Sequence, residues 1–275
     1  MHQVREDKLK ELGRQMRQYY HTADKYADRI ESRGEMAHCE YVSLVERYSQ
    51  PGQSLLDVGC GTGVSAHLLS RKGYRVTAMD VSPLFVERAR SRASGNLRLC
   101  AGDALQLPFS DGSFDIVGSF LVIEHITDVE QGLAEMARVT KPGGIVVICA
   151  PNVLSPFNQL YVLRDIILAR PRTYGGEERN PWKAILDLMA NTAVLLRKEF
   201  SLKPNFLYRT PRLENTAEHA PDCDMVYLAN PIDLKRWFVR RPGLRIVKYQ
   251  GETRVGRLLP DFVTGIHIVA QKLAA

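Results

Sequence analysis

One stretch decides the fold of this chain: Leu55-Leu56-Asp57-Val58-Gly59-Cys60-Gly61-Thr62-Gly63. Its apolar residues predict a short buried strand, and residues 64–71, which follow, have the spacing of a helix. Glycines at a strand-to-helix turn let the backbone approach a ligand closely, and the first turn of the helix offers free N–H groups to it. The segment therefore predicts a ligand-binding turn, and a glycine turn that binds nothing is the simpler alternative.

Strands and helices alternate along the chain after this turn. Further strands are expected at residues 74–79, 96–100, 114–120 and 145–150, with helices between them. Apolar strands separated by helices indicate a parallel sheet that is covered on both faces, which is an α/β fold. Right-handed crossovers place the carboxyl ends of the strands at one edge, and ligands bind there, where the strand order reverses.

The pattern divides the chain into three parts. Residues 1–50 predict an N-terminal helical cap, and residues 51–152 with 230–275 predict the α/β core. Residues 153–229 predict a helical insertion, because the alternation stops after Pro151 and two helix-like segments follow. We expect this insertion to lie over the ligand pocket as a substrate lid.

The composition of the 275 residues is that of a soluble globular protein, with 45% hydrophobic and 25% charged residues. It excludes wholesale disorder, collagen-like repeats and a polytopic membrane protein. The N-terminus lacks the apolar core of a signal peptide, and the five cysteines show no C-x-x-C spacing, so a cytoplasmic protein with reduced thiols is expected. The net charge is +6, and residues 153–212 hold ten Lys/Arg against five Asp/Glu.

The glycine turn alone does not choose between cofactors. Gly61-x-Gly63-x-x-Ala66 also fits the dinucleotide pattern G-x-G-x-x-G/A, and Asp80 lies near the distance at which an acid meets a ribose. An NAD(P)-dependent oxidoreductase therefore stays open at this point.

Four segments in regular order distinguish a methyl-donor cofactor from a dinucleotide. They are LLDVGCGTG (55–63), VTAMDVS (76–82), GDALQLPFSDGSFDIV (102–117) and VTKPGGIVVICAPN (139–152). Together they closely resemble the class I S-adenosylmethionine-dependent methyltransferases, nearest to the branch of the ubiquinone/menaquinone-biosynthesis enzymes. The resemblance covers about residues 50–152 and 244–271. It implies a Rossmann-like, mostly parallel sheet of seven strands, with S-adenosyl-L-methionine as cofactor and S-adenosyl-L-homocysteine as product.

The resemblance also implies a cofactor site, residue by residue. The loop beneath the methionine moiety would comprise Asp57, Gly59, Cys60, Gly61 and Gly63. Asp80, with Val81, would accept both ribose hydroxyls, and Asp103, with Ala104, would face the adenine amine. Phe120 and Leu121 would line the methionine moiety. A helix N-cap or a turn is the alternative role of Asp80 and Asp103.

The N-terminal segment YYHTADKYADRI (19–30) resembles the aromatic segment that closes over the cofactor in this branch. Tyr20 or Tyr26 would then present a ring face or hydroxyl near the sulfonium, since ring faces attract cations. Packing of this helix onto the core is the alternative.

His125 is the candidate catalytic residue, as a general base that takes a proton from a hydroxyl acceptor. A histidine that only hydrogen-bonds the following helix is its alternative. In the ubiquinone-pathway O-methyltransferases this stretch resembles a Glu-x-x-Glu-His metal site, but Leu121 replaces the first acid here, so no metal is predicted. His219, Asp222, Cys223 and Asp224 have no recognised ligand spacing, and a solvated turn is expected there.

These residues predict a methyltransferase for a small-molecule acceptor, with O- or C-methylation by in-line displacement. A non-catalytic S-adenosylmethionine-binding regulatory or assembly protein is the second hypothesis. The arginines of the insertion would suit an acidic acceptor, or contact with anionic membrane and a lipid-like acceptor, and a merely solvated lid surface is the simpler alternative. No nucleic-acid partner is expected.

Overall fold

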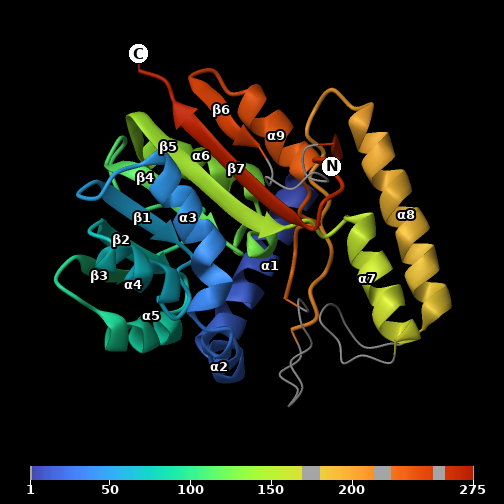
Figure 1. Ribbon diagram of the computed structural model, residues 1–275, viewed down its shortest axis with the longest axis horizontal. Coiled ribbons are helices and arrows are strands. Elements are labelled where there is room, and N and C mark those ends of the chain that lie inside the picture. The colour runs from blue at the N-terminus through green and yellow to red at the C-terminus, as the bar shows by residue number, and fades with distance from the viewer. Residues whose placement is uncertain (1, 169–179, 214–223, 250–257, 275) are drawn as a thin grey trace.

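The computed structural model describes residues 2–168, 180–213, 224–249 and 258–274, with side chains from Lys8 onward (Figure 1). Seven strands form one sheet in the order β3-β2-β1-β4-β5-β7-β6. They are β1 Ser54–Val58, β2 Arg75–Asp80, β3 Leu97–Ala101, β4 Phe114–Phe120, β5 Thr140–Pro151, β6 Leu244–Tyr249 and β7 Gly265–Lys272. Strands β1 to β5 pair in parallel, and β7 is antiparallel to both β5 and β6. The prediction of a seven-stranded, mostly parallel sheet is confirmed.

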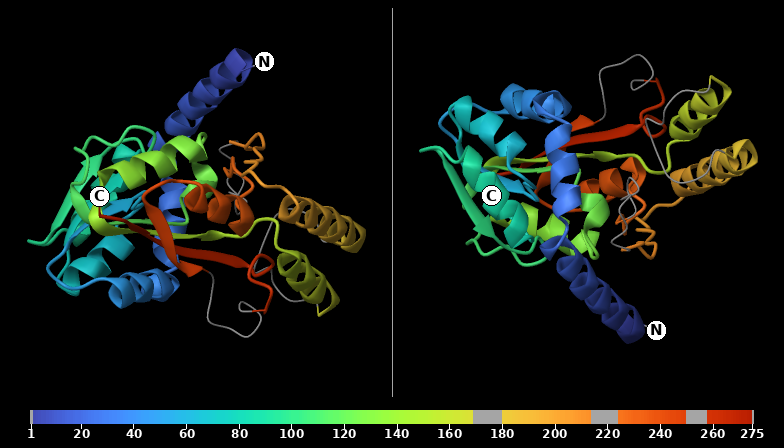
Figure 2. Two further views of the ribbon diagram at one scale, coloured as in Figure 1. Left: turned by 90° about the horizontal axis from the view of Figure 1, so that it is seen from above. Right: turned by 90° about the horizontal axis from the view of Figure 1, so that it is seen from below.

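Helices cover both faces of this sheet, as the alternating pattern predicts (Figure 2). One face packs against α6 and α9, and the other packs against α3 and α4. The helices are α1 His2–His21, α2 Asp24–Ser32, α3 Cys39–Tyr48, α4 Val64–Arg71, α5 Pro83–Ala89, α6 Val129–Val139, α7 Pro156–Ile167, α8 Pro181–Glu199 and α9 Pro231–Val239. The 3₁₀ turns Glu35–His38, Arg90–Arg92 and Ile123–His125 lie between them.

The strand order reverses at β1, which has β2 on one side and β4 on the other. Loops that leave the carboxyl ends of β1 and β4 therefore diverge, and the crevice between them is where an open α/β sheet binds its ligand. The glycine turn 59–63 and the segment 121–125 both start at this crevice.

Strand β5 starts earlier than its apolar run suggested. Residues 142–144, Pro-Gly-Gly, were expected to turn into a strand at residue 145, but β5 already begins at Thr140. The pairing of β4 with β5 shifts register between Phe114 and Ile116, so the glycines lie in an irregular stretch of the strand. Gly143 has a φ of +81°, which a residue with a side chain rarely adopts.

The insertion contains two packed helices, α7 and α8, that extend beyond the sheet (Figure 2). The two helix-like segments expected there are confirmed. A small apolar cluster of Leu154, Leu195 and Ile232 fixes the end of α8 to the core. Within the described ranges, no helix has both the length and the apolar character that a membrane span requires.

Candidate functional site

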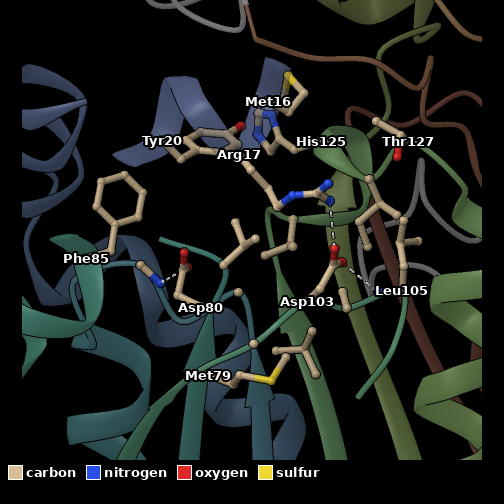
Figure 3. Close-up of a pocket in the computed structure, with 18 of the residues that line it drawn as sticks. Met16, Arg17, Tyr20, Met79, Asp80, Phe85, Asp103, Leu105, His125 and Thr127 are labelled. Carbon is tan, nitrogen blue, oxygen red and sulfur yellow. Dashed lines mark hydrogen bonds and ion pairs between the residues drawn. The ribbon is translucent and has the colours of Figure 1, made fainter. Parts of the chain in front are cut away.

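A pocket of about 820 Å³, its open mouth included, lies at the crevice beside β1 and β4 (Figure 3). Helices α1 and α2 form one wall, and the segments after β1, β2, β3 and β4 form the other walls. Ten of the residues expected at the site line this pocket: Tyr20, Tyr26, Gly59, Gly61, Asp80, Val81, Asp103, Ala104, Leu121 and His125.

Four other expected residues do not line the pocket: Asp57, Cys60, Gly63 and Phe120. The Phe120 ring instead stacks on Tyr41, with ring centroids 5.6 Å apart and an angle of 17° between the planes. Phe120 packs with the apolar cluster on the α3 and α4 face of the sheet, whereas the next residue, Leu121, turns into the pocket. Alternation along β4 puts Phe120 on the same face as Ile116, whereas Leu121 lies beyond the end of the strand with a φ of +55°, which turns its side chain away from that face.

The glycine turn is held tightly between two other segments. Gly59 and Cys60 donate backbone hydrogen bonds to the Met79 carbonyl, at 2.8 and 3.0 Å. Gly59 has a φ of +72°, and a Cβ there would lie only 2.4 Å from a Val122 methyl carbon. A Cβ at Gly61, in contrast, would meet nothing closer than Ile30, at 3.6 Å. Gly61 is therefore the position at which bare backbone faces the cavity.

Asp80 is buried at the end of β2, and its carboxylate can still accept further hydrogen bonds. Its Oδ2 accepts a hydrogen bond from the Gly61 N–H and its Oδ1 accepts one from the Ser82 N–H, both at 2.9 Å. Because a carboxylate has about four acceptor sites, two further donors such as a pair of hydroxyls fit here. Burial raises the pKa of Asp80 to about 6, although the two backbone N–H groups and the nearby His125 lower it.

Asp57 lies in β1, directly before the glycine turn, and is buried outside the pocket lining. Its Oδ1 accepts a hydrogen bond from the Tyr41 hydroxyl at 3.0 Å, while its buried Oδ2 has no hydrogen-bond partner in the described part of the chain. Burial raises the pKa of Asp57 to about 7, against the opposing effect of the Tyr41 hydrogen bond.

Asp103 is both a turn residue and an ion-pair partner. Its Oδ1 accepts the Leu105 N–H at 2.9 Å, and its Oδ2 accepts a hydrogen bond from the Arg17 guanidinium at 3.0 Å. The turn expected as an alternative is therefore present. Arg17 comes from α1 and points across the pocket mouth (Figure 3). A ligand amine at Asp103 would have to share this carboxylate with Arg17.

Aromatic rings from α1, α2 and α5 gather at one side of the pocket. The Tyr20 ring centroid lies 6.1 Å from those of Tyr26 and Phe85, and 6.3 Å from the His125 ring, to which it is nearly perpendicular. The Tyr20 hydroxyl does not point at a ligand, because it donates to Asp224 Oδ2 at 2.7 Å. Burial and the nearby Asp224 carboxylate raise the pKa of Tyr20, so the phenol stays protonated and donates.

Asp224 differs from the expectation of a solvated turn, which was wrong for this residue. Its side chain is fully buried, and its Oδ2 lies 3.3 Å from His125 Nδ1. His219, Asp222 and Cys223 lie outside the described residues. Within the part of the chain that the structure describes, no group of three or more His, Cys, Asp or Glu side chains is arranged to hold a metal ion.

The insertion approaches the pocket through its last residues and not through its helices. No residue of α7 or α8 lines the pocket, among the described residues. The segment after α8 instead runs back to the core, where Val226 and Tyr227 donate backbone hydrogen bonds to the Glu124 carbonyl at 2.8 and 2.9 Å. The predicted lid therefore remains a prediction, and neither helix forms a wall of this pocket.

Comparison with known proteins assigns a family to the segment that carries this pocket. The sequence profile of a family described as "Methyltransferase domain" matches residues 56–148. Residues 56–148 form a methyltransferase domain. This segment comprises β1 to β4 and most of β5, together with the glycine turn, Asp80 and Asp103.

Two curated relatives of this methyltransferase domain are each 42% identical to it over short stretches. A malonyl-[acyl-carrier protein] O-methyltransferase of Serratia marcescens aligns over 36% of this chain and 38% of its own length. A demethylmenaquinone methyltransferase of Thermobifida fusca aligns over 39% of this chain and 47% of its own length. The chain thus matches less than half of either relative. Over this segment the chain is similar to the class I S-adenosylmethionine-dependent methyltransferases, and the demethylmenaquinone enzyme among its relatives agrees with the expected resemblance to the quinone-biosynthesis branch.

Solved structures share the fold at low sequence identity. The 1,6-didemethyltoxoflavin-N1-methyltransferase of Burkholderia thailandensis superimposes with a TM-score of 0.56 at 15% identity, over 96% of this chain and 89% of that one. The [4+2]-cyclase SpnF gives a TM-score of 0.52 at 17% identity, over 86% and 82%. These similarities confirm the Rossmann-like fold.

The pocket of the methyltransferase domain suits S-adenosyl-L-methionine, the cofactor that the family assignment supports. Asp80 has room for two more hydrogen-bond donors, Gly61 offers bare backbone, and the rings of Tyr20 and Tyr26 stand where a cation would be favoured. The sequence did not predict which distant residues contact the site. These are Arg17, Tyr41, Val122 and Asp224. The basic residue Arg17 in the N-terminal helix carried no motif, and only its contact with Asp103 reveals its place.

Proposed function

We propose that this protein is an S-adenosylmethionine-dependent methyltransferase that transfers a methyl group to the oxygen or carbon of a small-molecule acceptor. The observation that carries this proposal is the buried Asp80 beside the glycine turn, within a segment that matches the methyltransferase domain. The named activities of the two curated relatives support an acidic or lipid-like acceptor. A cytoplasmic location belongs to the same proposal.

Residues of this chain would perform the reaction chiefly by holding two molecules in line. The cofactor supplies an activated methyl group. Asp80 would accept its ribose hydroxyls, Asp103 would face the adenine amine, and the Tyr20 and Tyr26 rings would stand beside its positive charge. Correct orientation contributes on the order of 7–11 kcal/mol to such reactions. His125 would take the proton of a hydroxyl acceptor.

A screen of metabolites with a methyl-labelled donor tests this function directly. We expect label to pass from the donor to a small molecule, and to disappear when His125→Ala is used with a hydroxyl acceptor. The fold alone does not decide the activity, since the structural relative SpnF is named a cyclase. Tight cofactor binding without labelled product from any acceptor class would favour the regulatory or assembly role.

The pH dependence of cofactor binding should follow Asp80. Only the ionised carboxylate accepts two hydroxyls, and the pKa of Asp80 is raised by burial to about 6. Affinity for S-adenosylhomocysteine should therefore increase as the pH rises through 6, and be about tenfold weaker at pH 5 than at pH 7.5. Calorimetry across this range measures the effect.

The variant Asp80→Asn separates the contribution of Asp80 from that of Asp57, whose raised pKa of about 7 also titrates in this range. Its affinity should be weak and nearly independent of pH. An affinity of the unchanged protein that stays constant between pH 5 and 7.5 would contradict the role of Asp80.

We further propose that α8 docks the protein on an anionic membrane. Its outer face carries exposed apolar side chains at spacings of three or four residues, with Trp182 at 73% and Leu186 and Met189 at 65% exposure. Lys183 and Arg197 lie beside this stripe. An apolar helix face with basic residues along its edge suits the surface of an anionic bilayer.

Liposome flotation tests this docking. The unchanged protein should float with vesicles that contain anionic lipid, and the double variant Leu186→Glu/Met189→Glu should lose this flotation, because it buries two charges at the interface. The control Met36→Glu changes a methionine that is still more exposed, at 83%, on the 3₁₀ turn Glu35–His38 and should float normally. If the unchanged protein floats with neither anionic nor neutral vesicles, the docking proposal is wrong.

A further inference from the structure

A buried carboxylate joins the insertion to the candidate base. Asp224 lies at the start of the segment that returns from the insertion, and its side chain is fully buried. Its Oδ2 accepts the Tyr20 hydroxyl at 2.7 Å and lies 3.3 Å from His125 Nδ1. The same ring nitrogen lies 3.4 Å from the Asp224 backbone carbonyl. Since a buried carboxylate is costly unless donors surround it, this arrangement favours a proton on His125 Nδ1.

We propose that Asp224 and Tyr20 are positioning residues that hold His125 as the Nδ1–H tautomer, with Nε2 left as the proton acceptor. The inference rests on the proposed methyltransferase function, because a base is needed only if a hydroxyl acceptor is methylated. As the acceptor oxygen bonds to the methyl carbon, its proton passes to Nε2, and the electron pair of the broken carbon–sulfur bond stays on sulfur. The Asp224 carboxylate then stabilises the imidazolium that forms.

Tyr20 also links this base to the cofactor side of the pocket. The Ser82 hydroxyl donates to the Tyr20 carbonyl at 2.7 Å, and the Ser82 N–H donates to Asp80 Oδ1 at 2.9 Å. A continuous series of contacts therefore runs from Asp80 through Ser82, Tyr20 and Asp224 to His125. The end of α1 has to be in place for both the cofactor acid and the base to be held.

Other charged groups face the ring as well. Glu124 Oε1 lies 3.8 Å from His125 Nε2, which is beyond hydrogen-bond distance, and Asp80 is close enough for the two groups to interact electrostatically. The contact that distinguishes Asp224 is therefore its approach to Nδ1, the nitrogen away from Glu124. We therefore infer that Asp224 orients the His125 ring, and the tautomer of the ring is the measurable consequence.

Nitrogen-15 NMR of the histidine rings in the full chain at pH 7.5 tests the inference without any acceptor. The His125→Gln variant identifies the His125 signals among the seven histidines. The unchanged protein should show the neutral Nδ1–H tautomer. In Asp224→Asn the atom in the place of Oδ2, which faces both the Tyr20 hydroxyl and Nδ1, belongs to a neutral amide, so the charge that favours Nδ1–H is lost and the share of the Nε2–H tautomer should rise. Asp128→Asn, the same chemical change at the N-cap of α6, should leave the signals unchanged.

Two outcomes overturn the inference: an Nε2–H or doubly protonated ring in the unchanged protein, or an unaltered tautomer in Asp224→Asn. Calorimetry with S-adenosylhomocysteine is measured in parallel, and Asp224→Asn should bind it within about threefold of the unchanged protein, because Asp224 does not line the pocket. A loss of this binding in Asp224→Asn alone would instead make Asp224 a residue that shapes the cofactor site, and would also overturn the inference. Failure of the unchanged protein to bind S-adenosylhomocysteine contradicts the proposed function, while the NMR result still decides the role of Asp224.

Discussion

Asp80→Asn is expected to weaken the binding of S-adenosylhomocysteine by about 100-fold or more. Hydrogen bonds to a charged group contribute about 1.5–3 kcal/mol each, and the proposed contact includes two of them to one carboxylate. The substitution keeps the shape of the side chain but removes its charge and half of its acceptor capacity. The amide NH₂ would also face one of the two backbone N–H groups, of Gly61 or Ser82, that the carboxylate now accepts. Isothermal calorimetry measures the effect.

The control for this experiment is Asp111→Asn. The Asp111 side chain is 80% exposed, pairs with Arg138 away from the pocket and should leave the affinity unchanged. Thermal unfolding of both variants confirms that each is folded. If folded Asp80→Asn binds S-adenosylhomocysteine as tightly as the unchanged protein, Asp80 is not the ribose acid.

Lys198→Met is expected to lower the free energy of unfolding by about 3–5 kcal/mol, the cost of breaking a buried ion pair by removing one partner. Lys198 Nζ lies 2.6 Å from Asp233 Oδ2, and the two side chains are 5% and 0% exposed. The substitution would leave the Asp233 charge buried without its cation, with the Asn230 side chain, the Asn205 N–H and the Tyr227 hydroxyl as donors. Denaturant unfolding measures the change.

Arg197→Met provides a matched comparison on the same helix. Arg197 is exposed, so its loss should change the stability by no more than about 0.5 kcal/mol. The pair Lys198–Asp233 joins α8 to α9, and its loss should release α8 from the core first. A Lys198→Met protein as stable as Arg197→Met would show that the pair contributes nothing to holding the insertion.

The core of the site could be predicted from the sequence because its signals are local. The glycine turn, Asp80 and Asp103 each follow a short apolar strand, and parallel strands bring their carboxyl ends to one edge. Phe120 shows the limit of such reasoning. Its position in the chain matched the pocket, but the alternation of side chains along β4 turns it to the opposite face, where it stacks on Tyr41.

Contacts between distant segments could not be predicted in this way. Arg17 reaches Asp103 across 86 residues, and Asp224 reaches His125 across 99 residues. No spacing rule connects such positions, because they meet only after α1 and the insertion have packed on the sheet. The hydrophobic pattern also did not predict where the insertion packs. Buried contacts of Leu195 and Lys198 attach α8 to the core, and neither helix of the insertion lines the pocket among the described residues.

Calorimetry of the unchanged protein with two ligands tests the central claim most directly. The account predicts that S-adenosylhomocysteine binds tightly in the pocket at the end of β1 and β2, and that NADH does not bind. Tight binding of NADH without binding of S-adenosylhomocysteine would contradict it, and would assign the glycine turn and Asp80 to a nicotinamide cofactor.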